Sequence, residues 1–412
     1  MSPVYQNPTT GPARSVLTEE GYSLAFIEFG EQGSYQDTSQ VEKAVELVRT
    51  TKKPVVITYV HGWHNNADSS DVPRFKHFLS EIAHTPLIQG EGFHVVGVYL
   101  AWRGESVDVP GLNAFTFYSR KAAAERLASN FDCFDAISSI AEAARKHHRR
   151  ENEYTILLGH SFGGLVVERA VAHAIDAEMH GRATKYNSMP ADLALVLNPA
   201  SDSILSRQII SALYQEKTEN ARPLFVSVTS TADSATGTIF PIGTTIAAVP
   251  KIFNQVSDPG PADKKESERN FYTSTPGHKA SLINHVAVKL DEPFDFPPGR
   301  TAMEINLSHA LSGDRVALPV KGKRPELWQL KRTAEIDVPY WDIQVDRSIF
   351  KSHGDIWNER AKALMAGVFS IANPVVERGH RHEADLQKPR DYKRAAYKQD
   401  NAPPPKVETP GH

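Results

Sequence analysis

The sequence contains very little cysteine and has no excess of charge of either sign. Its 412 residues include one cysteine, Cys133, so no disulfide can form within the chain. Cys133 stands in an apolar helical stretch, where we expect it to fill the core rather than to react. Lysine and arginine total 46 against 49 aspartates and glutamates, a formal net charge of −3. This balance gives no support to binding of nucleic acid or of an anionic membrane surface.

Long hydrophobic runs and targeting signals are also missing. No stretch approaches the roughly twenty apolar residues that span a bilayer, so stable membrane insertion is not expected. The chain starts Met-Ser-Pro-Val-Tyr, without a basic start or an apolar run of signal length. These features predict a cytoplasmic protein, although a secreted form trimmed of its leader would share them. The sequence does not predict the oligomeric state.

Apolar strand patterns alternate with helical patterns over much of the chain. The strand patterns, several of them continuous β-branched runs, lie at residues 22–29, 54–60, 93–101, 154–158, 193–197, 224–228 and 339–345. Helical patterns lie at residues 38–48, 74–84, 114–148, 165–180 and 356–371. This order predicts an α/β fold whose mostly parallel central sheet carries helices on both faces. The active site of such a sheet is expected at the carboxyl ends of its strands.

Less regular segments divide this core, which we assign to residues 21–233 and 336–375. Residues 1–20 are polar and rich in proline and threonine, and are expected to form a loose N-terminal segment. Residues 234–335 lack a strand–helix period and are predicted to form a long cap- or lid-like insertion over the carboxyl edge of the sheet. Charge, glutamine and proline dominate residues 376–412, which predicts a disordered tail.

The strongest functional signal is the segment Gly159-His160-Ser161-Phe162-Gly163, a G-x-S-x-G between a buried strand and a helix. A nucleophile elbow requires this strand–turn–helix setting, so Ser161 is predicted to be a nucleophile. Gly159 and Gly163 omit Cβ atoms that would clash in so tight a turn. The N-terminus of the following helix also favours negative charge that develops near the serine. His160 is interpreted as a supporting residue.

A second motif, Val60-His61-Gly62-Trp63, follows an early strand. Acyl transfer needs two donors for the oxyanion, and the backbone N–H groups of Phe162 and Trp63 are the predicted pair. Gly62 would let the backbone turn inward at this point. His61 is interpreted as a buried histidine that supports the loop rather than as a catalytic residue.

A serine nucleophile needs a general base, and the base needs a carboxylate that orients it. Asp233 follows the strand at 224–228 and is the preferred acid, while Asp202, after the preceding strand, is the rival. Among 17 histidines the preferred base is His353, between the last predicted strand and the last helix. Other histidines are expected to line the pocket or to satisfy local structure: His278, His285 and His309.

On these motifs the chain resembles the α/β-hydrolase superfamily, whose nucleophile, acid and histidine follow one another in this order. Within it, Tyr59-Val-His-Gly-Trp, Trp102-Arg-Gly-Glu and the elbow resemble a group of bacterial and fungal esterase- or lipase-like hydrolases. The resemblance covers roughly residues 50–235 and 335–372. It implies an α/β-hydrolase fold and a serine carboxylic ester hydrolase that forms an acyl-enzyme on Ser161. His353 would act as general base and acid, and Asp233 would orient it. The chain departs from a minimal member by the long insertion between acid and histidine.

The expected substrate is a small-molecule or lipid-like ester. An acyl-lipid hydrolase is the main alternative, because the apolar residues 237–250 would suit a mobile lid, although a buried cover packed on the sheet fits them equally well. Thioester or amide cleavage would use the same three side chains. A catalytically silent binding scaffold is least favoured, because every part of the triad is present. No cofactor is implied, and no cluster of histidine, cysteine and aspartate has the spacing of metal ligands.

Overall fold

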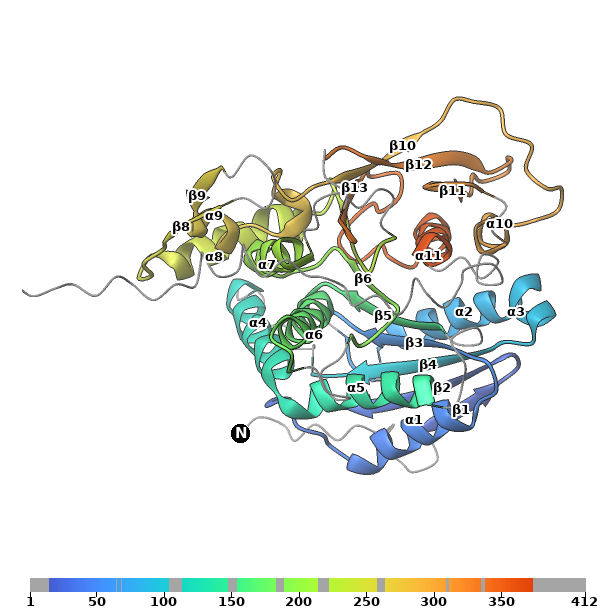
Figure 1. The fold of residues 1–412 in the computed structure, drawn as a ribbon, viewed down its shortest axis with the longest axis horizontal. Coiled ribbons are helices and arrows are strands. Elements are labelled where there is room, and N and C mark those ends of the chain that lie inside the picture. Colours follow the sequence, from blue (N-terminus) through green and yellow to red (C-terminus); the bar gives the residue numbers. More distant parts are fainter. Residues whose placement is uncertain are drawn as a thin grey trace, which may run out of the picture.

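The computed structural model describes residues 15–63, 65–67, 69–103, 113–146, 154–182, 189–213, 222–257, 264–308, 311–334 and 338–372. An eleven-stranded sheet runs through it in the order β1-β2-β4-β3-β5-β6-β7-β13-β10-β12-β11 (Figure 1). All neighbours from β2 to β10 in this order are parallel, whereas β1, β12 and β11 are antiparallel to theirs. The strands are β1 (Val16–Glu19), β2 (Tyr22–Glu28), β3 (Pro54–Val60), β4 (His94–Ala101), β5 (Tyr154–His160), β6 (Leu193–Leu197), β7 (Phe225–Ser230), β10 (His285–Lys289), β11 (Arg315–Leu318), β12 (Glu326–Arg332) and β13 (Tyr340–Val345). The fold is therefore a mixed α/β fold with a large, mostly parallel sheet.

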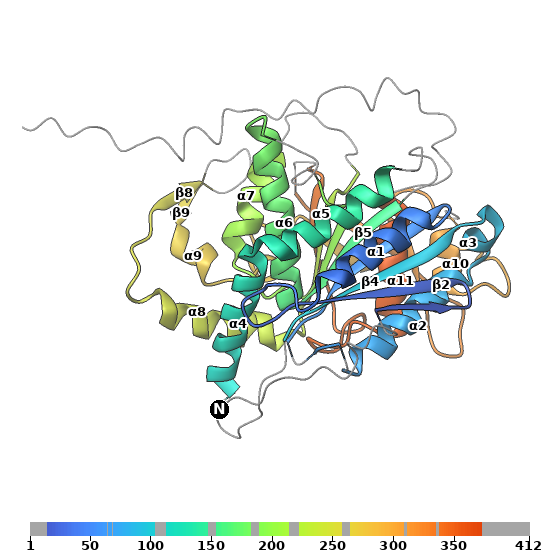
Figure 2. The ribbon, with the colours of Figure 1, turned by 90° about the horizontal axis from the view of Figure 1, so that it is seen from below.

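Helices cover both faces of this sheet. One face carries α2 (Asp71–Ala83), α3 (Pro86–Glu91), α10 (Ala302–Leu307) and α11 (Glu359–Ala372). The other carries α1 (Thr38–Thr50), α4 (Asn113–Ser129), α5 (Phe131–Lys146), α6 (Phe162–Met179) and α7 (Ser203–Leu213). Figure 2 shows α1 and α5 on one side of β2 and α2 on the other. Successive strand residues enter opposite cores, as Tyr59 and Val60 do, which explains why the central strands are apolar throughout.

Most predicted strands and helices are present with small shifts at their ends, and two local features differ. The helix predicted at 114–148 is two helices, α4 and α5, over its described part, which ends at residue 146. Asn130 separates them, and its Oδ1 accepts from Asp132 N, which opens α5. Residues 16–19 were expected to be loose but form β1, which pairs antiparallel with β2. Residues 1–14 and the predicted tail at 376–412 lie outside the described residues.

The segment predicted as one cap, residues 234–335, divides into two parts. Its first part holds the π-helix η2 (Ala235–Ile239), α8 (Phe240–Ala248), the hairpin β8 (Gln255–Ser257) and β9 (Lys265–Ser267), α9 (Glu268–Tyr272) and the 3-10 turn η3 (Pro276–His278). In its second part β10, β12 and β11 extend the main sheet beyond β13 instead of lying over its edge. Asn306 of α10 holds this extension, since its Nδ2 donates to Ala317 O of β11 and to Ala363 O of α11.

The strand order reverses between the neighbouring strands β3 and β5. From β3 the chain continues through α2 to β4 on one side, and from β5 through α6 to β6 on the other. The two connections leave in opposite directions, so a crevice is expected at the carboxyl ends of these strands, where ligands bind to open α/β sheets. The segment 61–63 and Ser161 follow these two carboxyl ends.

Candidate active site

Ser161 occupies a strained turn between β5 and α6. Its φ of 56° lies in the left-handed region, which costs a non-glycine residue roughly 1–3 kcal/mol. Neighbouring backbone holds the turn, because Ser161 N donates to Leu197 O at 3.1 Å and Ala200 N donates to Ser161 O at 3.0 Å. The serine is thereby fixed to the end of β6 and stands at the N-terminal end of α6, where the helix dipole favours negative charge.

Two glycines allow the loop after β3 to contact the elbow. A Cβ atom on Gly163 would lie 2.0 Å from Val60 O, and one on Gly62 would lie 2.7 Å from Ser161 Cβ. Both distances are far below van der Waals contact, so a larger residue at either position would push the end of β3 away from Ser161. The two sequence motifs are therefore parts of one site.

His353 joins Ser161 to Asp233 by hydrogen bonds. Its Nε2 lies 2.7 Å from Ser161 Oγ, and its Nδ1 lies 2.8 Å from Asp233 Oδ2. The Asp233 side chain is fully buried, whereas that of His353 is 26% exposed. An ionised carboxylate only accepts hydrogen bonds, so it places the proton on Nδ1 and leaves Nε2 able to accept the serine proton. We call these side chains the Ser161–His353–Asp233 array.

The Asp233 carboxylate is stabilised as an anion although it is buried. Burial alone would raise its pKa, but the hydrogen bond to His353, the attraction of an imidazolium at His353 and the hydrogen bonds from Thr236 outweigh burial and lower the pKa below its usual value. Asp233 Oδ1 accepts from the backbone N of Ala235 at 2.9 Å and of Thr236 at 3.2 Å. These donors leave Oδ2 facing the imidazole.

Asp202, the rival acid, is engaged elsewhere. Its Oδ2 lies 3.7 Å from Lys121 Nζ, and the same ammonium group donates to Glu125 Oε1 at 2.6 Å. Burial raises the pKa of the Asp202 carboxyl. The structure therefore brings Asp233 to His353 and pairs Asp202 with a lysine of α4.

His61 is a buried, neutral support for the loop after β3. Trp102 N donates to His61 Nε2 at 3.1 Å, so the ring proton is on Nδ1, which lies 2.8 Å from Gly62 O. Burial lowers the pKa of His61, and the ring stacks on that of Trp102 with centroids 5.6 Å apart. One ring nitrogen thus bonds within the loop and the other to the residue after β4, so neither is directed to Ser161.

Two side chains hold the carbonyl group of His353. His160 Nε2 lies 2.9 Å from His353 O, and Asn198 Nδ2 donates to the same oxygen at 3.0 Å. Burial and the nearby charge of His353 lower the pKa of His160 to about 4, so its ring is neutral with the proton on Nε2. Sequence reasoning included His160 but missed Asn198, whose φ of 45° and bond from Ser230 N to its Oδ1 lock the end of β6. An asparagine directly after a buried strand is the signal that could have identified it.

The predicted oxyanion donors each directly follow a residue at the contact between the two motifs: Phe162 follows Ser161, and Trp63 follows Gly62. Phe162 is fully buried and begins α6, whose first N–H groups point toward its N-terminal end. Trp63 is half-buried and ends the loop that Gly62 brings against Ser161. Phe162 N–H therefore belongs to the first turn of α6 directly after Ser161, and the role of Trp63 N–H stays a prediction.

Thr236 and His278 extend the array beyond the carboxylate, and sequence reasoning did not anticipate this contact. Thr236 Oγ1 donates to Asp233 Oδ2 at 2.6 Å, and the same oxygen lies 3.2 Å from His278 Nε2. Because the threonine hydrogen is given to the carboxylate, His278 Nε2–H is the donor in the second bond. Burial lowers the pKa of His278. The aspartate also accepts from backbone two and three residues on, a pattern typical of an Asx turn that a sequence reader could look for.

The remaining candidate side chains lie outside this array. His285 bonds to Asn284 Oδ1 at 2.8 Å, and burial lowers its pKa to about 3. Cys133 is buried, and burial raises the pKa of its thiol to about 12, which agrees with a core residue. His309 lies outside the described residues.

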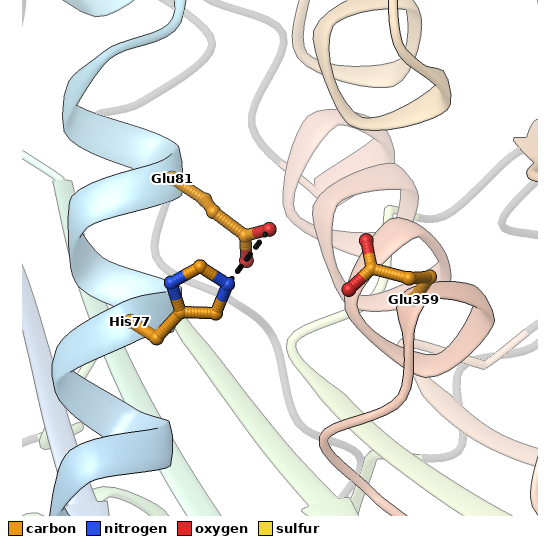
Figure 3. A group of neighbouring side chains, drawn as sticks. All are labelled: His77, Glu81 and Glu359. Carbon is orange, nitrogen blue, oxygen red and sulfur yellow. Dashed lines mark ion pairs between the residues drawn. The ribbon is translucent and has the colours of Figure 1, made fainter.

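One group of side chains in the described part of the chain has the composition of a metal site. His77 and Glu81 of α2 face Glu359 of α11, with one ligand atom from each within 4.8 Å of the others (Figure 3). However, Lys362 Nζ lies 2.7 Å from Glu81 Oε2 and 2.7 Å from Glu359 Oε1, and this lysine is 2% exposed. Its ammonium already supplies the positive charge that the carboxylates require. We interpret Glu81, Glu359 and Lys362 as an ion-pair network that joins α2 to α11.

A pair of acidic side chains is buried on the other face of the sheet. Glu168 of α6 and Asp342 of β13 are both fully buried. Ser206 Oγ donates to Glu168 Oε1 at 2.9 Å. Burial raises the pKa of Glu168 to about 7 and that of Asp342 well above its usual value. The folded chain therefore holds these carboxyl groups in their protonated form at pH values where the unfolded chain has released its protons.

The variant Glu168→Gln is expected to change how stability depends on pH. The glutamate has a folded-state pKa of about 7 against the ordinary 4.5, so between these values the folded state binds more protons and the wild type loses stability as pH rises. Glutamine keeps the volume and the acceptor for Ser206 but carries no proton to lose. The difference in free energy of unfolding, variant minus wild type, should therefore be larger at pH 8 than at pH 4.5 by on the order of 2–3 kcal/mol. Urea unfolding at both pH values measures this gain, and Glu91→Gln, the same change at an exposed site, should show none.

Within the described residues, no helix is both long and apolar enough to cross a membrane.

Comparison with known proteins gives little similarity. No protein-family model and no curated protein matches the chain. A thermophilic esterase, Est2 from the planctomycete Thermogutta terrifontis, is 14% identical over 44% of this chain and 62% of its own, with a TM-score of 0.24. An uncharacterized protein from Pseudomonas aeruginosa is 10% identical over 85% of this chain and 52% of its own, also with a TM-score of 0.24. The chain thus spans less than two thirds of either structure, and similarities this low establish neither a shared fold nor a shared activity.

Proposed function

We propose that the protein is a serine hydrolase of the α/β-hydrolase type that cleaves carboxylic esters through an acyl-enzyme on Ser161. The observation that carries this proposal is the Ser161–His353–Asp233 array, with 2.7 Å between Nε2 and Oγ and 2.8 Å between Nδ1 and Oδ2. The first distance suits proton transfer from Ser161 to His353, and the second lets Asp233 orient the imidazole, before any substrate is bound. The strained serine between a buried strand and a helix supports the same assignment.

In the first half-reaction, Ser161 Oγ attacks the ester carbonyl carbon while His353 Nε2 takes the hydroxyl proton. The carbonyl π pair moves to oxygen and forms a tetrahedral oxyanion. This intermediate collapses, the bond to the alkoxy oxygen breaks, and His353 returns its proton to that oxygen. The alcohol leaves, and the acyl group remains on Ser161. Asp233 keeps the imidazole in the required tautomer and stabilises its positive charge.

In the second half-reaction, water replaces the alcohol. His353 Nε2 takes a proton from water as the water oxygen attacks the acyl carbonyl carbon. It then protonates Ser161 Oγ as the bond between Oγ and the acyl carbon breaks and the carboxylic acid departs. The backbone N–H groups of Trp63 and Phe162 would donate to the oxyanion in both halves, and one such donor typically contributes about 10²–10³ in rate. The side chains invoked suffice for this chemistry without a cofactor.

The test is hydrolysis of p-nitrophenyl esters from acetyl to palmitoyl, combined with labelling by a fluorophosphonate. Turnover together with a covalent adduct on the Ser161 peptide, identified by mass spectrometry and missing from Ser161→Ala, is the expected result. Turnover that persists in Ser161→Ala, or an adduct on another serine, would contradict the proposal. Faster turnover of matched acyl thioesters or acyl amides, assayed in parallel, would keep the nucleophile and change the substrate class. The cytoplasmic location stays a prediction, which cell fractionation can check.

A further inference from the structure

Helix α8 and its flanking residues expose a stripe of large aliphatic side chains, which we call the α8 stripe. Its five members are 49%, 59%, 67%, 74% and 98% exposed in the order Ile239, Ile242, Ile246, Val249 and Ile252. They follow one another at spacings of three or four residues, so the helical members share one side of the helix. Phe131 of α5 is the one other large hydrophobic residue with comparable exposure among the described residues. Large exposed hydrophobic side chains are therefore concentrated at the stripe and are not spread over the surface of the described residues.

The opposite side of α8 is firmly packed, so the stripe belongs to the folded state. Phe240, Thr244 and Ala248 are all buried. Lys121 Nζ of α4 lies 5.5 Å from the centroid of the Phe240 ring. Figures 1 and 2 both place α8 beside α9 at one end of the molecule, with α3 and α10 at the other end. The helix thus presents its apolar side outward from a fixed base.

The chemistry of the stripe suits lipid better than a protein partner. The stripe consists of isoleucine and valine alone, and residues 234–250 contain no charged side chain. The one charged residue within its span is Lys251, whose Nζ lies 4.0 Å from the centroid of the Tyr272 ring of α9. Stable protein interfaces use about 20–30 residues from each partner and are anchored by tryptophan, tyrosine or arginine. One side of one helix offers neither that size nor those anchors. Partial burial of aliphatic side chains in a lipid surface needs no matching partner shape.

The stripe is joined directly to the proposed active site. The π-helix η2 begins at Ala235, two residues after Asp233, and runs without a break into α8. Thr236 of η2 donates to the Asp233 carboxylate. A surface that holds the α8 stripe therefore also holds the segment that carries the catalytic carboxylate, so the site would lie close to the lipid.

We infer that the α8 stripe docks on an uncharged lipid surface and that the esters hydrolysed are presented in such surfaces. The docking is a property of the stripe, and the substrate class rests on the proposed function. Burial of one isoleucine side chain corresponds to roughly a tenfold change in partitioning or more. Replacement of two adjacent members of the stripe should therefore release most of the bound protein.

The experiment is co-sedimentation of the full chain with phosphatidylcholine vesicles. Wild type and Phe131→Ser should sediment equally, whereas Ile242→Ser/Ile246→Ser should partition at least tenfold more weakly. Both variants should hydrolyse p-nitrophenyl acetate at the wild-type rate, which shows that they are folded, while the double variant alone loses rate on long-chain esters in vesicles. Equal sedimentation of the three proteins would overturn the inference. A dimer in analytical ultracentrifugation that the double variant dissociates would also overturn it, and would make the stripe a contact between two copies.

Ser161→Ala separates this inference from the proposed function. It should bind vesicles like the wild type and hydrolyse nothing. Stripe-dependent sedimentation without esterase activity in any variant would leave the docking intact and refute the hydrolase proposal. Hydrolysis of acetyl esters by a wild type that does not sediment would refute the docking and leave the hydrolase proposal intact.

Discussion

Ser161→Ala and His353→Ala are each expected to lower kcat for ester hydrolysis by about 10⁶-fold, and the double variant should lose no more than either single one. In the proposed mechanism serine and histidine act as one unit, because Oγ is a weak nucleophile until Nε2, 2.7 Å away, takes its proton. Removal of either member therefore removes the same step, and the losses do not add. Steady-state hydrolysis of p-nitrophenyl acetate by the wild type and the three variants measures this.

The matched control is His77→Ala, which removes an exposed imidazole from α2 and should leave kcat at the wild-type value. Each variant must also show the wild-type melting temperature, so that lost activity is not lost fold. Losses that multiply in the double variant would mean that the two side chains serve separate steps. In that case the hydrogen bond between them would have no catalytic role.

The candidate site can be predicted from the sequence where a short local pattern specifies the geometry. The elbow around Ser161 needs glycine where backbones touch, so its motif carries the geometry of the turn. Asp233 and His353 were identified only by their places after predicted strands, and their mutual distance depends on β7 and β13 being neighbours in the sheet. The contact from Thr236 to His278 joins two turns 42 residues apart, and no local pattern specifies it.

In the fold, too, strands with a clear local pattern can be predicted from sequence, whereas the pairing of distant strands cannot. Apolar runs such as 54–60 and 193–197 specify buried strands directly, because both faces of those strands are covered. The strands β10, β11 and β12 instead have mixed burial, and the sequence pattern of this part resembles that of a loop-rich cap. They join the sheet because β10 pairs parallel to β13 and β12 pairs back on β10. Such pairing cannot be derived from the segment itself.

Asp233→Asn is expected to lower kcat by about 10⁴-fold while the fold is retained. The reason lies in the donors around the side chain. Backbone N–H groups of Ala235 and Thr236 bond to Oδ1, so the amide oxygen of asparagine must take that position. Its NH₂ group then faces His353 Nδ1 and donates to it, which forces the ring proton onto Nε2. In this tautomer Nε2 can no longer accept the proton of Ser161.

The rival carboxylate provides the control for this prediction. Asp202→Asn makes the same chemical change after the neighbouring strand, but there it breaks a contact with Lys121 and touches no part of the array. Its kcat should stay near the wild-type value. A large loss in Asp202→Asn with little change in Asp233→Asn would transfer the acid role to Asp202. Equal small losses would mean that Ser161 and His353 work without a carboxylate partner, and that the 2.8 Å contact between His353 and Asp233 serves the fold alone.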